Sequence, residues 1–184
     1  TPQALDQIYG VGLARGPRLP LIQVPTTAGT GSEVTPIAIV TTPTHEKKGV
    51  VSPLLYPDLA VLDAELTLGL PPAITAMTGI DAMVHAIEAY TSRLKKNPLA
   101  DALAREALRL LYVNLPKVLD DGRDIAARSA MLTGSMMAGM AFANAPVAAV
   151  HALAYPLGGH FHVPHGLSNA LVLAPVLRYN LPEA

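Results

Sequence analysis

The sequence changes character at Gly69-Leu70-Pro71-Pro72, and this change limits the folds that the chain can adopt. Before it, short apolar runs rich in Val and Ile alternate with Pro, Gly and Thr turns, a pattern typical of β-strands. After it, apolar residues recur with helical periodicity, broken only by short Pro and Gly interruptions. We therefore predict an α/β part over residues 1–68, followed by an all-α part over residues 69–184.

The apolar runs of the first part resemble the latter portion of a mostly parallel nucleotide-binding sheet, although few crossover helices separate them. In the second part Pro156 and the glycines at 158 and 159 predict the end of one helix, and Pro164 predicts the start of the next. The predicted strands cover 21–24, 37–40, 50–51 and 59–62, and the predicted helices cover 73–78, 80–92, 99–115, 124–142, 147–155 and 166–179.

Composition narrows the class of protein. With 184 residues, 51% of them hydrophobic and 15% charged, the chain can bury a substantial core and is expected to fold. A net charge of −1, with no basic cluster larger than Lys47-Lys48 or Lys95-Lys96, argues against nucleic acid as a partner. Because cysteine is absent, any bound metal must be held by nitrogen and oxygen atoms.

Residues 129–159 carry no Asp, Glu, Lys or Arg and are long enough to span a bilayer. Their Pro, Asn and His residues, together with many Gly and Ala residues, instead suit a buried helix pair, so we expect no membrane span. The first residues lack an initiator Met and the pattern of a signal peptide, so we expect a cut end and a cytoplasmic protein.

Asp81 and His85 are four residues apart in a segment with helical character. Residues at i and i+4 project from one face of a helix, so this pair can form half of a metal site. Glu88 shares the same face, where we expect an ordinary buried polar contact rather than support of a metal ligand.

Four of the six histidines, His151, His160, His162 and His165, fall within one short segment. A helix-loop-helix bend there could bring His151 and His165 face to face, giving with Asp81 and His85 a ligand set suited to Fe(II), Zn(II), Mn(II) or Co(II). The alternative is that these are ordinary hydrogen-bonded core or surface histidines, and the residues alone leave both readings open. We expect His160 and His162 to flank the site. The sixth histidine, His45, is expected at the surface.

The segment 25–33, Pro-Thr-Thr-Ala-Gly-Thr-Gly-Ser-Glu, follows a predicted strand and consists largely of hydroxyl residues and glycines. Such a loop lets backbone N–H and side-chain O–H groups approach a phosphate or a ribose closely. It is neither a P-loop nor a G-x-G-x-x-G fingerprint, and an ordinary Thr/Gly turn explains it equally well.

Three motifs in order, 25–33, 79–90 and 151–166, resemble those of the iron-containing (group III) alcohol dehydrogenases. The resemblance implies a dehydroquinate synthase-like architecture, with the latter part of a nucleotide-binding α/β domain before an incomplete helical, metal-binding catalytic domain. It implies hydride transfer between an alcohol or aldehyde and NAD or NADP, a divalent metal with Fe²⁺ preferred over Zn²⁺, and a homo-oligomer.

The resemblance also assigns residues. The implied metal ligands are Asp81, His85, His151 and His165, and Tyr155 stands where many family members have a further histidine, so it is the candidate to orient or protonate the substrate oxygen. The implied cofactor contacts are Thr26, Thr27, Thr30, Gly31 and Ser32 in the loop, with Lys47 or Lys48 near the ribose.

The resemblance leaves alternatives open. The family's Gly-Gly-Gly-Ser motif for pyrophosphate should precede Thr1, and family members continue beyond Ala184, so the chain is expected to be a fragment that could lack turnover. A maleylacetate reductase, a glycerol dehydrogenase, a lyase like dehydroquinate synthase and a non-catalytic metal- or nucleotide-binding fragment are the alternatives.

Overall fold

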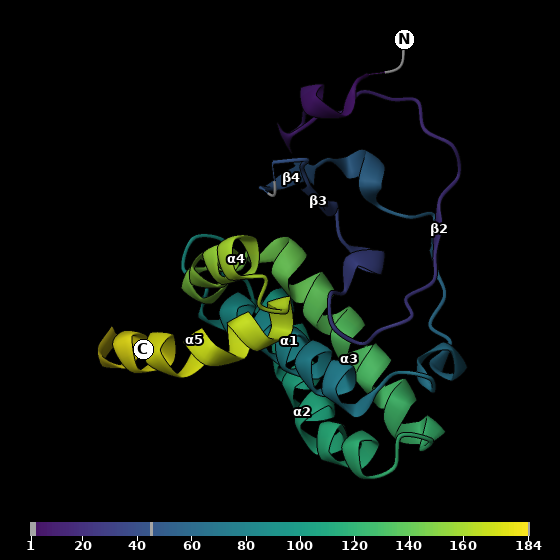
Figure 1. Ribbon diagram of the computed structural model, residues 1–184, viewed down its shortest axis with the longest axis vertical. Helices are drawn as coiled ribbons and strands as arrows, with labels where there is room; N and C mark the ends of the chain where they lie inside the picture. Colours follow the sequence, from purple (N-terminus) through teal and green to yellow (C-terminus); the bar gives the residue numbers. More distant parts are fainter. Residues whose placement is uncertain (1–2, 45, 184) are drawn as a thin grey trace.

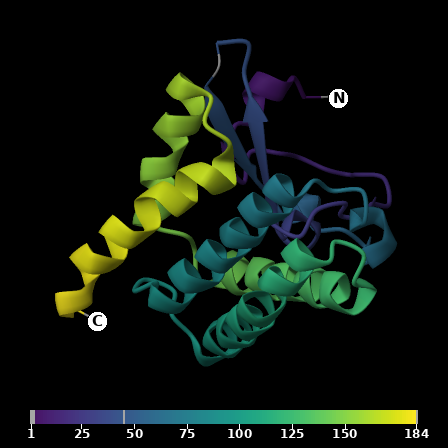
Figure 2. The same cartoon turned by 60° about the horizontal axis from the view of Figure 1, so that its bottom comes forward.

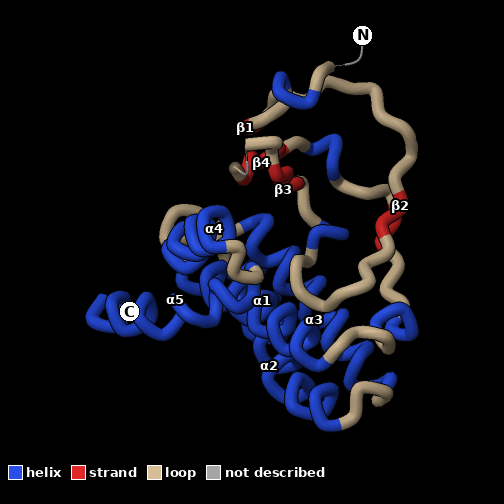
Figure 3. Tube along the Cα trace, viewed as in Figure 1, coloured by secondary structure: helices blue, strands red, loops and turns tan. Residues whose placement is uncertain are grey.

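The computed structural model describes residues 3–44 and 46–183, with short strands at one end of the molecule and five α-helices at the other (Figures 1 and 3). The strands are β1 (Gly10–Val11), β2 (Ile22–Gln23), β3 (Ile37–Thr41), β4 (Lys47–Val51) and β5 (Leu59–Ala60). The helices are α1 (Pro72–Thr91), α2 (Pro98–Asp120), α3 (Ile125–Asn144), α4 (Ala149–Phe161) and α5 (His165–Asn180). Short 3-10 helices lie at Leu5–Gln7, Ser32–Val34, Pro53–Leu55, Ala64–Thr67 and Leu181–Glu183.

The strands form two small sheets, with orders β1-β4-β3 and β2-β5. Two of the three strand pairings are parallel, as expected, but the longest pairing is antiparallel. β1–β4 and β2–β5 are parallel but pair only two residues each, whereas the antiparallel β3–β4 pair has five, from Ile37 opposite Val51 to Thr41 opposite Lys47. The connection between β3 and β4 is too short for a parallel crossover, so it can join only antiparallel strands.

Helices α1, α2 and α3 pack together and enclose most of the apolar core. Both α2 and α3 begin at a side-chain cap, since Asn97 accepts a hydrogen bond from the amide of Ala100 and Asp124 accepts one from the amide of Ala127. Figure 2 shows these three helices side by side, with α4 and α5 crossing beside them. The largest fully buried apolar side chains are Leu111, Met131, Leu132, Val84, Val118 and Val150.

Helix α1 is continuous where the sequence suggested two helices, 73–78 and 80–92. Gly79 lies inside it, and a Cβ there would come within 2.7 Å of Leu115 Cδ1 and 3.0 Å of Met131 Cε. The glycine therefore permits close packing of α1 against α2 and α3 rather than ending the helix. This continuity keeps Asp81 and His85 on one rigid element.

Helix α4 runs through Pro156, Gly158 and Gly159 to Phe161, so the predicted end at Tyr155 is wrong. Pro156 is exposed, and at such a position the helix tolerates the missing N–H donor. The helix ends after Phe161, at the C-cap residue His162, whose φ is +57°. Helix α5 then starts against α1, because a Cβ at Gly166 would overlap the carbonyl oxygen of Met77. This contact brings the start of α5 onto the middle of α1.

Within the described residues no single helix is long and apolar enough to cross a membrane, while α3 and α4 taken together satisfy length and composition but are bent by 108°.

Candidate metal centre and cleft

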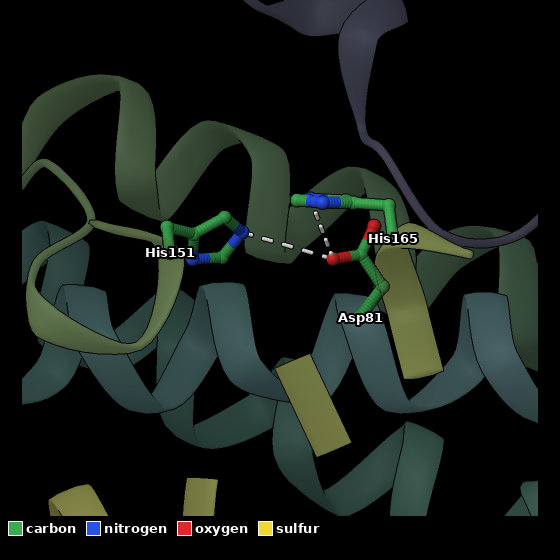
Figure 4. A group of neighbouring side chains, drawn as sticks. All are labelled: Asp81, His151 and His165. Carbon is green, nitrogen blue, oxygen red and sulfur yellow. Dashed lines mark ion pairs between the residues drawn. The ribbon is translucent and has the colours of Figure 1, made fainter. Parts of the chain in front are cut away.

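Asp81 lies at the centre of a cluster of histidines drawn from three helices. Its Oδ1 is 3.5 Å from Nε2 of His165 on α5, 3.7 Å from Nε2 of His151 on α4 and 4.0 Å from Nε2 of His85 on its own helix. Figure 4 shows His151 and His165 directed at this one oxygen from two sides. One donor atom each from Asp81, His151 and His165 lie within 4.8 Å of one another. The bend after α4 therefore brings together the two histidines expected to meet.

His85 stands at the edge of this cluster. Its ring is stacked between Phe142, with centroids 4.5 Å apart, and His151, with centroids 4.6 Å apart. Its Nδ1 lies 3.3 Å from the carbonyl oxygen of Gly29. A carbonyl oxygen can only accept, so this contact assigns the proton to Nδ1 and leaves the lone pair of Nε2 facing Asp81.

Glu88 holds His151 from the side opposite Asp81. Its Oε2 lies 2.6 Å from Nδ1 of His151, and its Oε1 accepts a hydrogen bond of 2.7 Å from the amide of Val150. The buried polar contact expected for Glu88 is thus a hydrogen bond to a ring of the cluster, and it orients that ring. The sequence signal was its place at i+7 from Asp81, on the face that already carried the candidate ligands.

Burial and neighbouring charges shift the pKa values of these side chains in opposite directions. Burial raises the pKa of Asp81, but the three neighbouring histidines outweigh it and leave the pKa below its usual value. Burial lowers the pKa of His151, yet its contact with Asp81 and its hydrogen bond to Glu88 dominate and raise that pKa to about 9. His85 behaves oppositely, since burial lowers its pKa to about 4.

This donor set fits a divalent cation. Asp81 and Glu88 are both buried, and within residues 3–44 and 46–183 neither forms an ion pair with Lys or Arg. Two buried carboxylates need a positive charge beside them, either a proton on His151 or a cation among the ligand atoms. Imidazole nitrogens with one carboxylate oxygen suit Fe(II) or Zn(II).

A cleft of about 810 Å³ opens from the cluster toward the strands. Of the residues expected to contact a cofactor, Thr30, Ser32 and Lys47 line it. It is also lined by Tyr155, whose ring stacks on His165 with centroids 5.9 Å apart, and burial is the main cause that raises the pKa of this tyrosine. The cleft thus joins the histidine cluster to the hydroxyl-rich loop.

The remaining expected cofactor residues do not line this cleft. Lys48 follows Lys47 on β4, so the two side chains point to opposite faces of the strand, and Lys48 pairs with Glu46 at 3.2 Å. Gly31 has a φ of +57° and packs against α3, where a Cβ would come within 2.6 Å of the Cα of Gly139. Thr26 and Thr27 lie earlier in the loop, outside the lining.

Of the other histidines, the structure describes His160 and His162. His162 lines the cleft, while His160 is exposed and lies outside its lining. This agrees with a flanking position for His162. The expectation that His45 lies at the surface falls outside the described residues.

Asn169 is a residue of the site that the sequence did not reveal. It lies on α5 one turn after His165, is fully buried and donates a hydrogen bond of 2.6 Å to Oδ1 of Asp81. The only available signal was its spacing of four residues from a candidate ligand.

Comparison with known proteins agrees with this geometry. Residues 75–184 match the C-terminal profile of the Fe-containing alcohol dehydrogenase family, and residues 3–64 match the profile named iron-containing alcohol dehydrogenase. This chain belongs to the iron-containing alcohol dehydrogenase family. The two matched ranges leave the predicted division at 69 between them, and this division stays a prediction.

Several relatives share about half of the aligned residues with this chain. The chain is 50% identical over 165 residues to the probable alcohol dehydrogenase EutG of Escherichia coli K12, covering 89% of this chain and 42% of that protein. It is 44% identical over 178 residues to 1,3-propanediol dehydrogenase of Klebsiella pneumoniae, covering 96% of this chain and 46% of that protein. The chain therefore spans less than half the length of these relatives.

Solved structures of the iron-containing alcohol dehydrogenase family have the same fold, a small sheet region followed by helices. A crystal structure of 1,3-propanediol oxidoreductase superposes with a TM-score of 0.93 at 43% identity, covering 98% of this chain and 47% of that one. The structure of sulfoacetaldehyde reductase from Bifidobacterium kashiwanohense, solved in complex with NAD+, superposes with a TM-score of 0.91 at 36% identity. The match covers 98% of this chain and 48% of that one. The dehydroquinate synthase-like architecture expected from the sequence is confirmed.

Proposed function

We propose that this chain forms the metal-binding and cofactor-facing part of an oxidoreductase that transfers hydride between an alcohol or aldehyde and a nicotinamide cofactor. The observation that carries the proposal is the convergence of Asp81, His151 and His165 within 4.8 Å at one end of the cleft. Its support from relatives is the alcohol and propanediol dehydrogenase names that they bear.

In this proposal Asp81, His85, His151 and His165 hold a divalent metal, Fe²⁺ or Zn²⁺. When bound, such a cation supplies Lewis-acid polarisation of the substrate oxygen. The side chains orient the partners. Gly29 fixes the tautomer of His85 and Glu88 that of His151, and Phe142 packs against the cluster and limits the access of water.

The nicotinamide cofactor, NAD or NADP, is proposed to lie along the cleft toward the strands. Thr30 and Ser32 offer hydroxyl groups there, and Lys47 offers a positive charge. Thr26, Thr27 and Gly31 would shape the same loop, and Lys48 is the weaker of the two lysine candidates because Glu46 already pairs with it. The NAD+ in the related sulfoacetaldehyde reductase structure supports this cofactor class.

A bound nicotinamide cofactor would accept the hydride from the carbinol carbon, so the chain's own task would be to hold the substrate oxygen and take up the hydroxyl proton. Tyr155 is the candidate to orient the substrate oxygen or carry this proton, because its ring lies against His165 within the cleft. The names of the relatives favour alcohol or aldehyde chemistry over a maleylacetate reductase, a glycerol dehydrogenase or a dehydroquinate synthase-like lyase.

The test is a nicotinamide absorbance assay on the full-length protein with Fe²⁺ or Zn²⁺ restored and its metal content measured. A panel of short alcohols and aldehydes, each with NAD(H) and NADP(H), should reveal turnover that His165→Ala removes and His160→Ala retains. Metal-loaded protein that turns over no member of the panel contradicts the activity. Size-exclusion chromatography and cell fractionation test two further proposals, a homo-oligomer and a cytoplasmic location.

A further inference from the structure

Asn169 reaches the ligand cluster from α5 and is fully buried. Its Nδ2 lies 2.6 Å from Oδ1 of Asp81, 3.3 Å from Nε2 of His151 and 3.4 Å from Nε2 of His165. One amide nitrogen is therefore within hydrogen-bond range of an atom of each of three proposed ligands. Of these contacts the one to Asp81 is much the shortest, and its length is that of a hydrogen bond to a charged acceptor.

Only the contact to Asp81 can persist when a cation is bound. A neutral imidazole offers one lone pair at Nε2, and a metal ion would take it from His151 and His165. A carboxylate oxygen has two lone pairs, so Oδ1 of Asp81 can accept from the amide while it faces a cation. The Asn169 amide is thus suited to hold the Asp81 carboxylate both with and without a bound cation.

The orientation of the amide leaves a buried oxygen without a partner. Oδ1 of Asn169 has no hydrogen-bond partner among the described residues. Turning the amide over would place that oxygen against the Asp81 carboxylate, where two acceptors would repel each other. The protein accepts an unpartnered carbonyl oxygen, which is unfavourable in a buried site, in order to keep an N–H group on Asp81.

We propose that Asn169 is a positioning residue that fixes the Asp81 carboxylate within the ligand cluster. The inference rests on the proposed metal site and deepens it. Asp81 belongs to α1 and Asn169 to α5, so their hydrogen bond also sets how the start of α5, with His165, sits over the carboxylate.

The test compares Asn169→Ala and Asn169→Leu with Ser168→Ala in the purified full-length protein. Leu keeps the approximate size of the side chain without its N–H group. Ser168 is the matched control, because it is equally buried on the same turn but its hydroxyl bonds only the backbone carbonyls of Val163 and Pro164. Zn²⁺ affinity is measured by competition with a chromophoric chelator, and Co²⁺ absorption spectra report the geometry of the ligands.

Both Asn169 variants should bind Zn²⁺ about 10- to 100-fold more weakly than the parent protein and alter the Co²⁺ spectrum, while Ser168→Ala changes neither. Circular dichroism of the metal-free proteins identifies any variant that has lost its fold. The inference is then judged on the Asn169 variant that keeps its fold. Affinity within about twofold of the parent, with an unchanged spectrum, overturns the inference. A parent protein that binds neither ion, or binds as well with Asp81→Ala, instead overturns the metal site itself.

Discussion

Glu88 Oε2 lies 2.6 Å from Nδ1 of His151, and the other oxygen of the same carboxylate accepts the amide of Val150. Both oxygens are therefore committed to donors, and the carboxylate determines which nitrogen of His151 faces Asp81. Supporting contacts of this kind commonly change metal affinity by about 10- to 100-fold.

We expect Glu88→Gln to weaken metal binding by about 10- to 100-fold and to lower the free energy of unfolding by about 1–3 kcal/mol. The amide can serve only one of the two donors as an acceptor, so the other meets an N–H group. Chelator competition and urea unfolding measure the two effects. Glu106→Gln is the control, because Glu106 is only half-buried and pairs with Arg109 on the same helix, α2, away from the histidines. Equal behaviour of the two variants would mean that Glu88 has no supporting role.

Lys47 and Lys48 form a natural matched pair on β4. Lys47 lines the cleft, whereas Lys48 pairs with Glu46 outside the lining. We expect Lys47→Ala to weaken cofactor binding by about tenfold or more, since a hydrogen bond from a charged donor contributes about 1.5–3 kcal/mol. Lys48→Ala should change it by less than about twofold. NADH fluorescence titration measures both, and a larger loss in Lys48→Ala would reverse the assignment.

Tyr155 can be tested without disturbing its packing. Tyr155→Phe keeps a ring against His165 and removes only the hydroxyl group. If that group orients or protonates the substrate oxygen, kcat should fall by about 10²-fold, the lower end of the range for general acid–base catalysis. Tyr112→Phe on the outer side of α2 is the control, because its side chain is 73% exposed. Unchanged kcat in Tyr155→Phe would leave the residue with packing alone.

Gly139 allows the loop at 26–32 to lie directly on α3. A Cβ at this position would come within 2.6 Å of the carbonyl oxygen of Gly31 and 3.0 Å of Val34. Gly139→Ala should therefore lower the free energy of unfolding by about 1–3 kcal/mol and weaken cofactor binding. Gly69→Ala, where a Cβ meets nothing within 4 Å, should do neither. Urea unfolding and NADH titration check both effects, and two variants of equal stability would argue against this contact.

The Arg18–Asp58 ion pair at the β2–β5 ladder predicts a pH dependence. Hydrogen bonding to Arg18 is the main cause that lowers the pKa of Asp58 to about 2. The unfolded chain therefore binds this proton more readily, so the stabilising contribution is present above about pH 4 and lost as pH falls toward 2. The Val61 amide donates a hydrogen bond to the carbonyl oxygen of Gln23 across the ladder. Its protection against hydrogen exchange should decrease as pH falls over this range.

Asp58→Asn removes the titrating group of this ion pair. Protection of the Val61 amide in this variant should be low and nearly constant from pH 4 to pH 2. The same decrease in the parent protein and the variant would show that another group is responsible.

Helical periodicity placed Asp81 and His85 correctly on one helix face, but it did not give the helix boundaries. Asp81 and His85 could be assigned to one face because residues four apart coincide on any regular helix. The helix boundaries depended on Gly79 and Pro156, which were interpreted as interruptions. Whether a helix can continue through such residues depends on their neighbours in space. Gly79 packs against side chains of α2 and α3, and Pro156 lies at the exposed surface.

The sequence placed Glu88 on the face of Asp81, but it could not predict the hydrogen-bond partner of Glu88 or of Asn169. Glu88 and Asn169 are 63 and 18 residues from His151 along the chain, and a hydrogen bond across such a distance depends on how α1, α4 and α5 cross. The crossing itself is fixed by contacts such as Gly166 on Met77, which no periodicity encodes.

The contact between Gly29 and His85 joins the hydroxyl-rich loop to the histidines around Asp81 through one carbonyl oxygen. Any free energy that orders this loop also favours the His85 tautomer with its lone pair toward Asp81. Linkage is reciprocal, so a cation held by His85 should favour the loop conformation by the same free energy. A cofactor bound at the loop and a metal bound at His85 would then be coupled ligands, and the affinity for each would depend on the occupancy of the other.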